Sequence, residues 1–193
     1  MNIIQTPIKD LIVLEPIVHE DDRGYFFESF NAKVYQPLNI NTHFVQDNQS
    51  KSSRGILRGL HYQCGEWAQA KLVRVLSGEV LDIAVDIRLD SPTYGQYYSA
   101  LLSGENKRQM YIPRGFAHGF VVLSETAEFF YKCDNFYNKE SEGGIVWNDP
   151  QLNIDWQIDL SLIQVSAKDA ILPCSRILDR FLVKILPSTH HMP

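Results

Sequence analysis

Short apolar runs typical of β-strands recur along almost the whole sequence, and segments rich in glycine, proline, serine or aspartate separate them. Many short strands with turns at this spacing favour an all-β sandwich or barrel with a few short peripheral helices. We expect strands at residues 11–18, 25–30, 43–47, 55–63, 71–77, 79–88, 97–102, 109–112, 117–123, 127–133 and 144–147.

The clearest strand pattern is EVLDIAVDIR, residues 79–88, in which apolar residues alternate with others. A period of two places on one face the apolar side chains of Leu81, Ile83, Val85 and Ile87. The opposite face carries Asp82, Ala84, Asp86 and Arg88. The pattern therefore predicts a strand with one buried face.

Helices are expected at a few positions outside these strands. Asn31 is a favourable N-cap for a helix over residues 32–38, and Ser166 is one for a turn over residues 167–172. Residues 175–183 are expected to form a last helix.

Length and composition predict one domain over residues 1–193, with residues 183–193 as a C-terminal tail. The net charge of −5 gives no reason to expect nucleic-acid binding, so an anionic ligand would have to meet a local cluster of cations. No stretch approaches the roughly 18 apolar residues of a membrane span. The 3 cysteines share no metal-ligand spacing, which favours a reduced, cytoplasmic protein.

One apolar run, RGILRGLHYQ at residues 54–63, carries charged or ionisable side chains at Arg58 and His61. Lys71 follows in the next apolar run, and several buried cations in one place indicate an anion site. Strict alternation would put Arg58 and His61 on opposite faces of a strand. A bulge or kink at Gly59 would bring both into one pocket, so we predict irregular strand pairing there.

The segment IPRGFAHGF, residues 112–120, contains the pattern P-x-G-x-x-H, which ends at His118. It resembles the second motif of the cupin double-stranded β-helix, a jelly-roll barrel in which this histidine points into the barrel mouth. The first-motif position reads His61-Tyr62-Gln63, so the second histidine of a metal-binding H-x-H is missing. With Glu66 only loosely placed, we predict no metal, and His118 becomes a hydrogen-bonded pocket histidine.

Without a metal, His61 has the right type for a general base near neutral pH. Such a base gains from a carboxylate that fixes its tautomer and stabilises the imidazolium. Spacing alone does not select that carboxylate among the 23 acidic residues.

Ordered blocks along residues 1–182 resemble the dTDP-4-dehydrorhamnose 3,5-epimerase family. The blocks are DDRGYFFESF, FVQDNQS, RGILRGLHYQ, AKLVRVLSGEVLDIAVDIR, SPTYGQ, LSGENKRQMYIPRGFAHGF, YKCDNFYNKESEGGIVWNDP and SAKDAILP. The resemblance implies a cupin-like fold and epimerisation of dTDP-4-dehydro-6-deoxy-D-glucose at carbons three and five, giving dTDP-4-dehydro-L-rhamnose.

The resemblance also implies roles for individual residues. His61 matches the catalytic base, Asp169 its carboxylate partner, Tyr131 the general acid and Lys71 the lysine near the ketone oxygen. Positions that match substrate contacts are Gln46, Asp47, Asn48, Arg58, His118, Tyr137, Glu142 and Lys168. A further set matches a nucleotide-binding strand that family members contribute across a homodimer interface near residues 22–30, namely Arg23, Phe26 and Glu28.

The chemistry of the reaction suits these residue types. The ketone at carbon four acidifies the protons at carbons three and five, because the carbanion delocalises onto the oxygen as an enolate. Inversion needs a base on one face and a proton donor on the other, which His61 and Tyr131 supply, and a cation such as Lys71 stabilises the enolate. The ketone itself acidifies the protons to be removed, so no cofactor is expected.

Alternatives remain open at this point. A mono-epimerase acting on a related dTDP-keto sugar, a non-catalytic sugar-nucleotide-binding cupin and a metal-dependent cupin oxygenase share much of this framework. Tyr131 and Phe26 also fit simple packing roles, and Glu28 fits a solvated edge charge. The chain departs from the family pattern at Ala70, where glycine is usual, and at Arg114, where an acid is common. Cys64 and Trp67 in the segment before Lys71 are also unusual.

Overall fold

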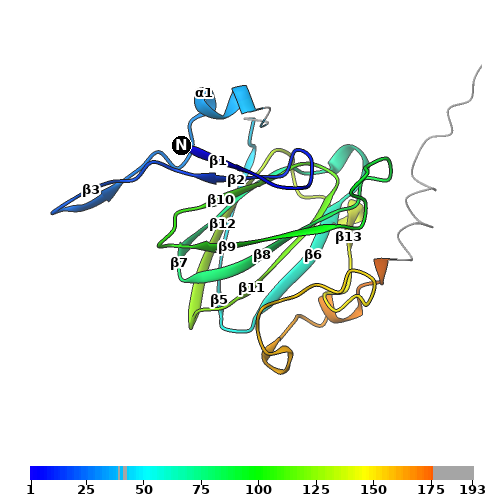
Figure 1. The fold of residues 1–193 in the computed structure, drawn as a ribbon. Helices are drawn as coiled ribbons and strands as arrows, with labels where there is room; N and C mark the ends of the chain where they lie inside the picture. Colours follow the sequence, from blue (N-terminus) through cyan, green and yellow to red (C-terminus); the bar gives the residue numbers. More distant parts are fainter. Residues whose placement is uncertain (39, 41–42, 176–193) are drawn as a thin grey trace, which may run out of the picture.

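The computed structural model describes residues 1–38, 40 and 43–175, and within these two antiparallel sheets face each other (Figure 1). The first sheet has the strand order β1 (Asn2–Gln5), β2 (Ile12–Glu15), β10 (Gln109–Ile112), β7 (Lys71–Ser77), β12 (Thr126–Cys133), β5 (Gln46–Ser53). The second has the order β13 (Glu142–Gly144), β6 (Leu57–Gln63), β11 (Phe116–Val122), β8 (Glu79–Asp86), β9 (Tyr97–Ser103). From β5 onward the chain passes repeatedly between the sheets, which is the winding of a jelly roll. The predicted all-β, cupin-like fold is confirmed.

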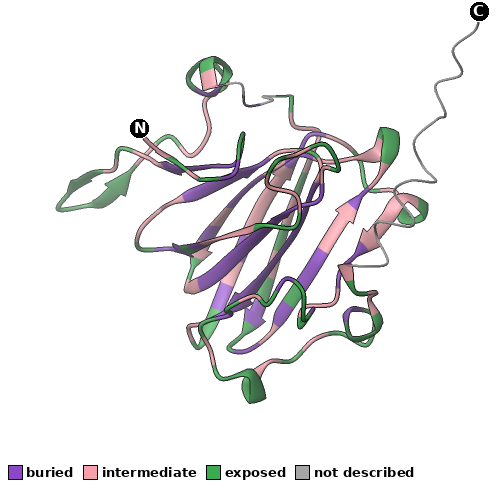
Figure 2. Cartoon of the chain, turned by 45° about the vertical axis from the view of Figure 1, so that its right-hand side comes forward, coloured by how far each residue is buried: buried purple, intermediate pink, exposed green. Residues whose placement is uncertain are grey.

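Three apolar layers hold the sheets in place. The main core lies between them, with Phe129 of the first sheet stacked on Phe120 of the second at 4.1 Å between ring centroids. The segment after β13 covers the outer face of the second sheet with side chains that include Trp156. The N-terminal segment covers part of the first sheet and buries Tyr35. Figure 2 shows that buried residues gather in the central strands of the two sheets.

The expectation that strand β8 has only one buried face is wrong. Every residue from Val80 to Asp86 is buried, because the strand lies in the middle of its sheet with covering side chains on both sides. Asp82 and Asp86 are therefore interior carboxylates that need hydrogen-bond partners. Asp86 accepts hydrogen bonds from Arg88, Ser91 and Thr93.

Strand β5 is longer and more polar than the sequence predicts. The expected strand covered residues 43–47, whereas the structure has Gln46–Ser53 with the sequence QDNQSKSS. This strand is an edge strand paired along its length with β12, so backbone hydrogen bonds stabilise it without an apolar pattern. The strands from β6 to β12 agree with their predicted ranges to within a few residues.

The exposed hairpin of β3 (His19–Asp21) and β4 (Gly24–Phe26) extends away from the two sheets (Figure 1). Beyond it lies α1 (Ala32–Tyr35), which Asn31 caps by accepting a hydrogen bond from the Lys33 amide, as predicted. Short 3-10 turns complete the described elements: η1 (Gln36–Leu38), η2 (Gly65–Trp67), η3 (Lys139–Ser141), η4 (Leu160–Leu162) and η5 (Asp169–Ile171).

Two expectations lie outside the described residues. The last helix over residues 175–183 and the tail at residues 183–193 fall almost wholly in the range 176–193, which the structure does not describe. Among the described helices, none has the length and apolar character needed to cross a membrane.

Candidate active site

Strand β6 contains the predicted irregularity at Gly59. His61 pairs with His118 and Arg58 with Phe120, so β6 carries one residue more than β11 between these two pairs. Gly59 has φ +131°, a conformation that side chains rarely adopt. A Cβ atom there would lie 2.5 Å from Gly119 Cα, so the two strands approach closely at a pair of glycines. The bulge turns both Arg58 and His61 toward the same cavity.

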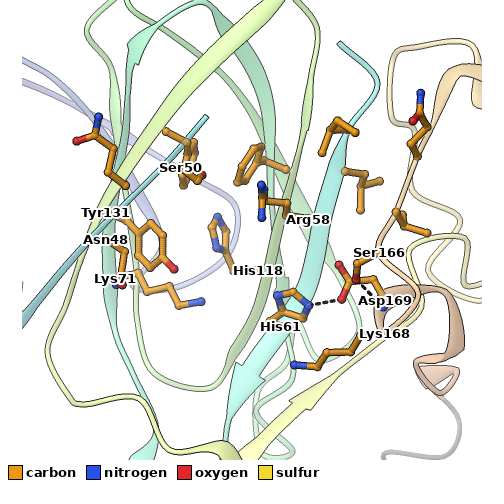
Figure 3. Close-up of a pocket in the computed structure, with 17 residues that line it drawn as sticks. Asn48, Ser50, Arg58, His61, Lys71, His118, Tyr131, Ser166, Lys168 and Asp169 are labelled. Atoms are coloured by element: carbon orange, nitrogen blue, oxygen red, sulfur yellow. Dashed lines mark hydrogen bonds and ion pairs between the residues drawn. The ribbon is translucent and has the colours of Figure 1, made fainter. Parts of the chain in front are cut away.

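That cavity has a volume of about 620 Å³ and is lined mainly by β5, β6, β7, β11, β12 and the segment before η5. Its ionisable and polar lining includes most of the predicted site, namely Asn48, Arg58, His61, Lys71, His118, Tyr131, Lys168 and Asp169. Figure 3 shows His61 and Asp169 on one side of the cavity and Tyr131 with Lys71 on the other, with His118 between them.

His61 and Asp169 form the pair that spacing alone could not find. The Nε2 atom of His61 lies 2.7 Å from Asp169 Oδ1, and the Asp169 side chain is almost fully buried. Ser166 Oγ accepts a hydrogen bond from the Asp169 amide at 3.0 Å, although the N-cap of η5 itself is Lys168. A buried carboxylate in this position fixes the imidazole tautomer and stabilises its protonated form.

A second carboxylate–imidazole pair lies beside the first. Nε2 of His118 is 3.0 Å from both oxygens of Asp82, and both side chains are buried. Burial lowers the pKa of His118, so its ring is neutral near pH 7. Burial also raises the pKa of Asp82, while the neighbouring His118 and Lys71 oppose that shift.

Lys71 and Tyr131 come from neighbouring strands of the first sheet. The Lys71 ammonium lies 5.8 Å from the centre of the Tyr131 ring. Burial lowers the pKa of Lys71, while Cys133 and Asp82 oppose that shift. Burial also raises the pKa of Tyr131 to about 12, so the phenol keeps its proton throughout the neutral range.

A connected group of polar side chains adjoins the cavity at Lys168. Glu142 Oε2 accepts a hydrogen bond from the Tyr137 hydroxyl at 2.9 Å and pairs with Lys168 Nζ at 2.6 Å. Burial raises the pKa of Glu142, but the hydrogen bonds from Lys168 and Tyr137 outweigh it and lower that pKa overall. Gln46 is connected to this group because its Oε1 accepts the Tyr137 amide at 3.1 Å.

Some predicted residues do not reach this cavity. Asp47 lies on the opposite face of β5 from Asn48 and pairs with Lys132 at 3.0 Å. Arg23, Phe26 and Glu28 belong to the projecting hairpin and the segment after it, outside the lining of the cavity. The Arg23 side chain is 90% exposed and pairs with Asp21.

The structure adds residues that sequence reasoning missed. Alternation predicts Asp82 on the solvent-exposed face of its strand, whereas the structure buries it. The signal for a buried polar site was a charged residue inside the apolar run EVLDIAVDIR. Ser50 and Ser166 line the cavity from segments with no chemical motif. No group of three or more His, Cys, Asp or Glu side chains suited to a metal ion occurs among the described residues, and the metal-free site stays a prediction.

Comparison with known proteins agrees with this geometry. The sequence profile of the family described as dTDP-4-dehydrorhamnose 3,5-epimerase matches residues 5–176. This chain belongs to that family. The predicted membership, and with it the prediction of an epimerase, is confirmed.

Individual relatives support the assignment. The dTDP-4-dehydrorhamnose 3,5-epimerase of Salmonella typhimurium is 54% identical over 184 residues, which cover 95% of this chain and 98% of the relative. A crystal structure of the Legionella pneumophila 3,5-epimerase in complex with dTDP-4-keto-L-rhamnose is 54% identical with a TM-score of 0.89, covering 94% of this chain and 96% of that one. A 3'-monoepimerase from Streptomyces bikiniensis is more distant, at 30% identity and a TM-score of 0.86, covering 92% of this chain and 90% of that one.

Substitution at Gly59 tests whether the close approach of β6 and β11 requires glycine at this position. Gly59→Ala should lower the free energy of unfolding by about 3 kcal/mol or more, because the new Cβ overlaps the Gly119 backbone in addition to the φ cost. Gly24 is the matched control, since its φ is +124° and nothing lies within 4 Å of an added Cβ. Gly24→Ala should cost only about 1 kcal/mol. Urea denaturation measures both, and equal losses would contradict the account.

Proposed function

We propose that the cavity around His61 carries out the family's reaction, the epimerisation of dTDP-4-dehydro-6-deoxy-D-glucose at carbons three and five. The observation that carries this proposal is the placement of the His61–Asp169 pair on one side of the cavity and the protonated Tyr131 on the other. Two-sided acid–base chemistry is what inversion at a carbon next to a ketone requires.

His61 is the base in this proposal. Its ring is partly exposed to the cavity, with 30% of the side chain accessible, while Asp169 behind it is buried. Removal of a proton from carbon three or five makes the imidazole an imidazolium, and the adjacent carboxylate stabilises that charge. Both carbons flank the same ketone, so one base can serve them in turn if the sugar ring shifts between the two steps.

Tyr131 is the acid, and Lys71 stabilises the enolate. A phenol with a pKa of about 12 holds its proton until the enolate carbon, a much stronger base, is formed. Lys71 shares that wall, and its ammonium stabilises the negative charge that develops on the ketone oxygen. The return of a proton from Tyr131 to the face opposite His61 inverts the carbon.

The remaining cavity residues bind the substrate. Arg58 and Lys168 provide cations for the diphosphate, and Arg58 is held toward the cavity by a hydrogen bond to Ser52 at 3.1 Å. His118 and Asn48 line the cavity and provide polar partners for the sugar. Tyr137, which is 55% exposed, offers a stacking surface for thymine.

We also propose a homodimer in which each hairpin serves the partner's cavity. Tyr25 and Phe26 are exposed aromatic residues on this hairpin, and Arg23 beside them does not line the cavity of its own chain. An exposed apolar hairpin of this kind suits burial against a second copy. The cytoplasm is the proposed compartment, which agrees with free thiols at Cys64, Cys133 and Cys174.

Isotope exchange tests the proposed reaction. Incubation with dTDP-4-dehydro-6-deoxy-D-glucose in deuterated water should place deuterium at both carbon three and carbon five, because each proton leaves to His61 and another returns from solvent-exchanged Tyr131. NMR of the sugar resolves the two positions. Label at one carbon alone would indicate a mono-epimerase, and binding without any label would indicate a non-catalytic protein.

Complementation between two inactive variants tests the exchanged hairpin. His61→Asn removes the base, and Arg23→Ala with Phe26→Ala removes the hairpin contacts, so each homodimer should have little activity. In a mixed dimer one site combines an intact His61 with an intact partner hairpin. Random mixing should therefore restore about a quarter of wild-type activity. No recovery in mixtures shown to contain heterodimers would mean that each hairpin does not serve its partner.

A further inference from the structure

The proposed ketone-binding residue Lys71 is positioned by its backbone. It is the first residue of β7, directly after the irregular segment that contains η2. Among the described residues, the Lys71 ammonium makes no hydrogen bond or ion pair. It makes a cation–π contact with the Tyr131 ring, whose centre lies 5.8 Å away. The Lys71 backbone is in register with Cys133 of β12 and Ile112 of β10, whereas Ala70 lies outside the strand and needs contacts of its own.

Asp134 supplies that interaction at the residue before Lys71. The Asp134 amide donates to the Ala70 carbonyl at 3.1 Å, and Asp134 Oδ1 accepts the Ala70 amide at 2.7 Å. One residue thus binds both backbone groups of Ala70. Asp134 directly follows Cys133, whose Cα pairs with that of Lys71 across the two strands. The contact therefore fixes the start of β7 against the end of β12, the strand that carries Tyr131.

Arg114 completes the contact from a third element. Its Nε donates to Asp134 Oδ2 at 2.9 Å from the turn between β10 and β11, the strand that carries His118. The Asp134 side chain is 1% exposed, whereas that of Arg114 is 47% exposed. A carboxylate this buried is costly without a counter-charge, so Arg114 keeps Asp134 in the geometry that holds Ala70.

We propose that Arg114 and Asp134 are a positioning pair that sets the location of the Lys71 ammonium, and so the rate of enolate formation. The inference rests on the role proposed above for Lys71. Neither residue lines the cavity, so we assign the effect of the pair to its contacts with the Ala70 backbone beside Lys71. A displacement of about 1 Å at a group that stabilises the transition state costs on the order of a hundredfold in rate, without comparable loss of nucleotide binding.

The structure contains a matched control for this pair. Arg88 Nε donates to Asp86 Oδ1 at 2.9 Å, and the Asp86 side chain is fully buried. Asp86 ends β8, and neither partner lines the cavity. Arg88→Met and Arg114→Met therefore remove the same kind of ion pair from a buried aspartate, but only the second pair holds the strand end that bears Lys71.

Steady-state kinetics of the full-length protein, measured well below each variant's unfolding temperature, tests the proposal. Arg114→Met should lower kcat by about tenfold or more and leave KM and the affinity for dTDP within about twofold, whereas Arg88→Met should leave kcat near wild type. In a Lys71→Met background, Arg114→Met should cause no further loss of kcat. The double variant Arg114→Met/Asp134→Asn should recover most of the rate, because asparagine still accepts the Ala70 amide without a buried charge.

Equal kcat values for Arg114→Met and Arg88→Met would overturn the proposal. It would also be overturned if Arg114→Met lowered kcat in the Lys71→Met background as much as it does in the wild type. Amide hydrogen exchange supplies a readout that does not require activity. Arg114→Met should speed exchange at Ala70 by about tenfold relative to wild type, and unchanged protection would refute the positioning contact. Failure of the wild type to epimerise would instead count against the proposed function, and the two failures are distinguishable.

Discussion

The close crossing of β6 and β11 at Gly59 and Gly119 is the constraint on which the site depends. A regular strand would separate Arg58 and His61, whereas the extra residue at Gly59 turns both toward one cavity. The amide of Gly59 also lies 3.5 Å from Asp169 Oδ2, so the same distortion brings backbone next to the partner of His61. Only glycines on both strands allow the backbones to approach this closely.

Electrostatics around this crossing divides the cavity into two sides. Asp169 and Asp82 place buried carboxyl groups beside His61 and His118, and the Asp169 carboxylate favours proton acceptance at His61. Lys71 and a protonated Tyr131 occupy the opposite wall. This polarity suits removal of a proton on one face, transient charge on the ketone oxygen and proton return on the other face.

The sequence predicted the all-β fold and the distortion at Gly59 from local signals, namely alternation, turn residues and the charged residues within RGILRGLHYQ. It predicted the family from ordered blocks that resemble that family. It did not predict that both faces of β8 are buried, or that the polar segment Gln46–Ser53 forms strand β5. Burial of Asp82 depends on segments far along the chain that cover the second sheet, and β5 is stabilised by backbone pairing with β12. The Asp169 partner of His61 came from the family resemblance, since the two residues are 108 positions apart.

Two of the departures from the family pattern lie together in the structure. Ala70 and Arg114 both bind Asp134, a meeting of three segments that no local pattern could indicate. The proposed positioning of Lys71 depends on tertiary contacts of this kind. Such contacts join distant segments, so the family resemblance predicted site residues but not the interactions that hold them.

The central claim is that His61, brought inward by the Gly59 bulge, is the base for both carbons. Its most direct test is solvent deuterium exchange by His61→Asn, followed by NMR at each position, with dTDP binding measured in parallel. The account predicts that exchange at carbons three and five falls together by on the order of a thousandfold while dTDP still binds. Exchange at either carbon at the wild-type rate would contradict it.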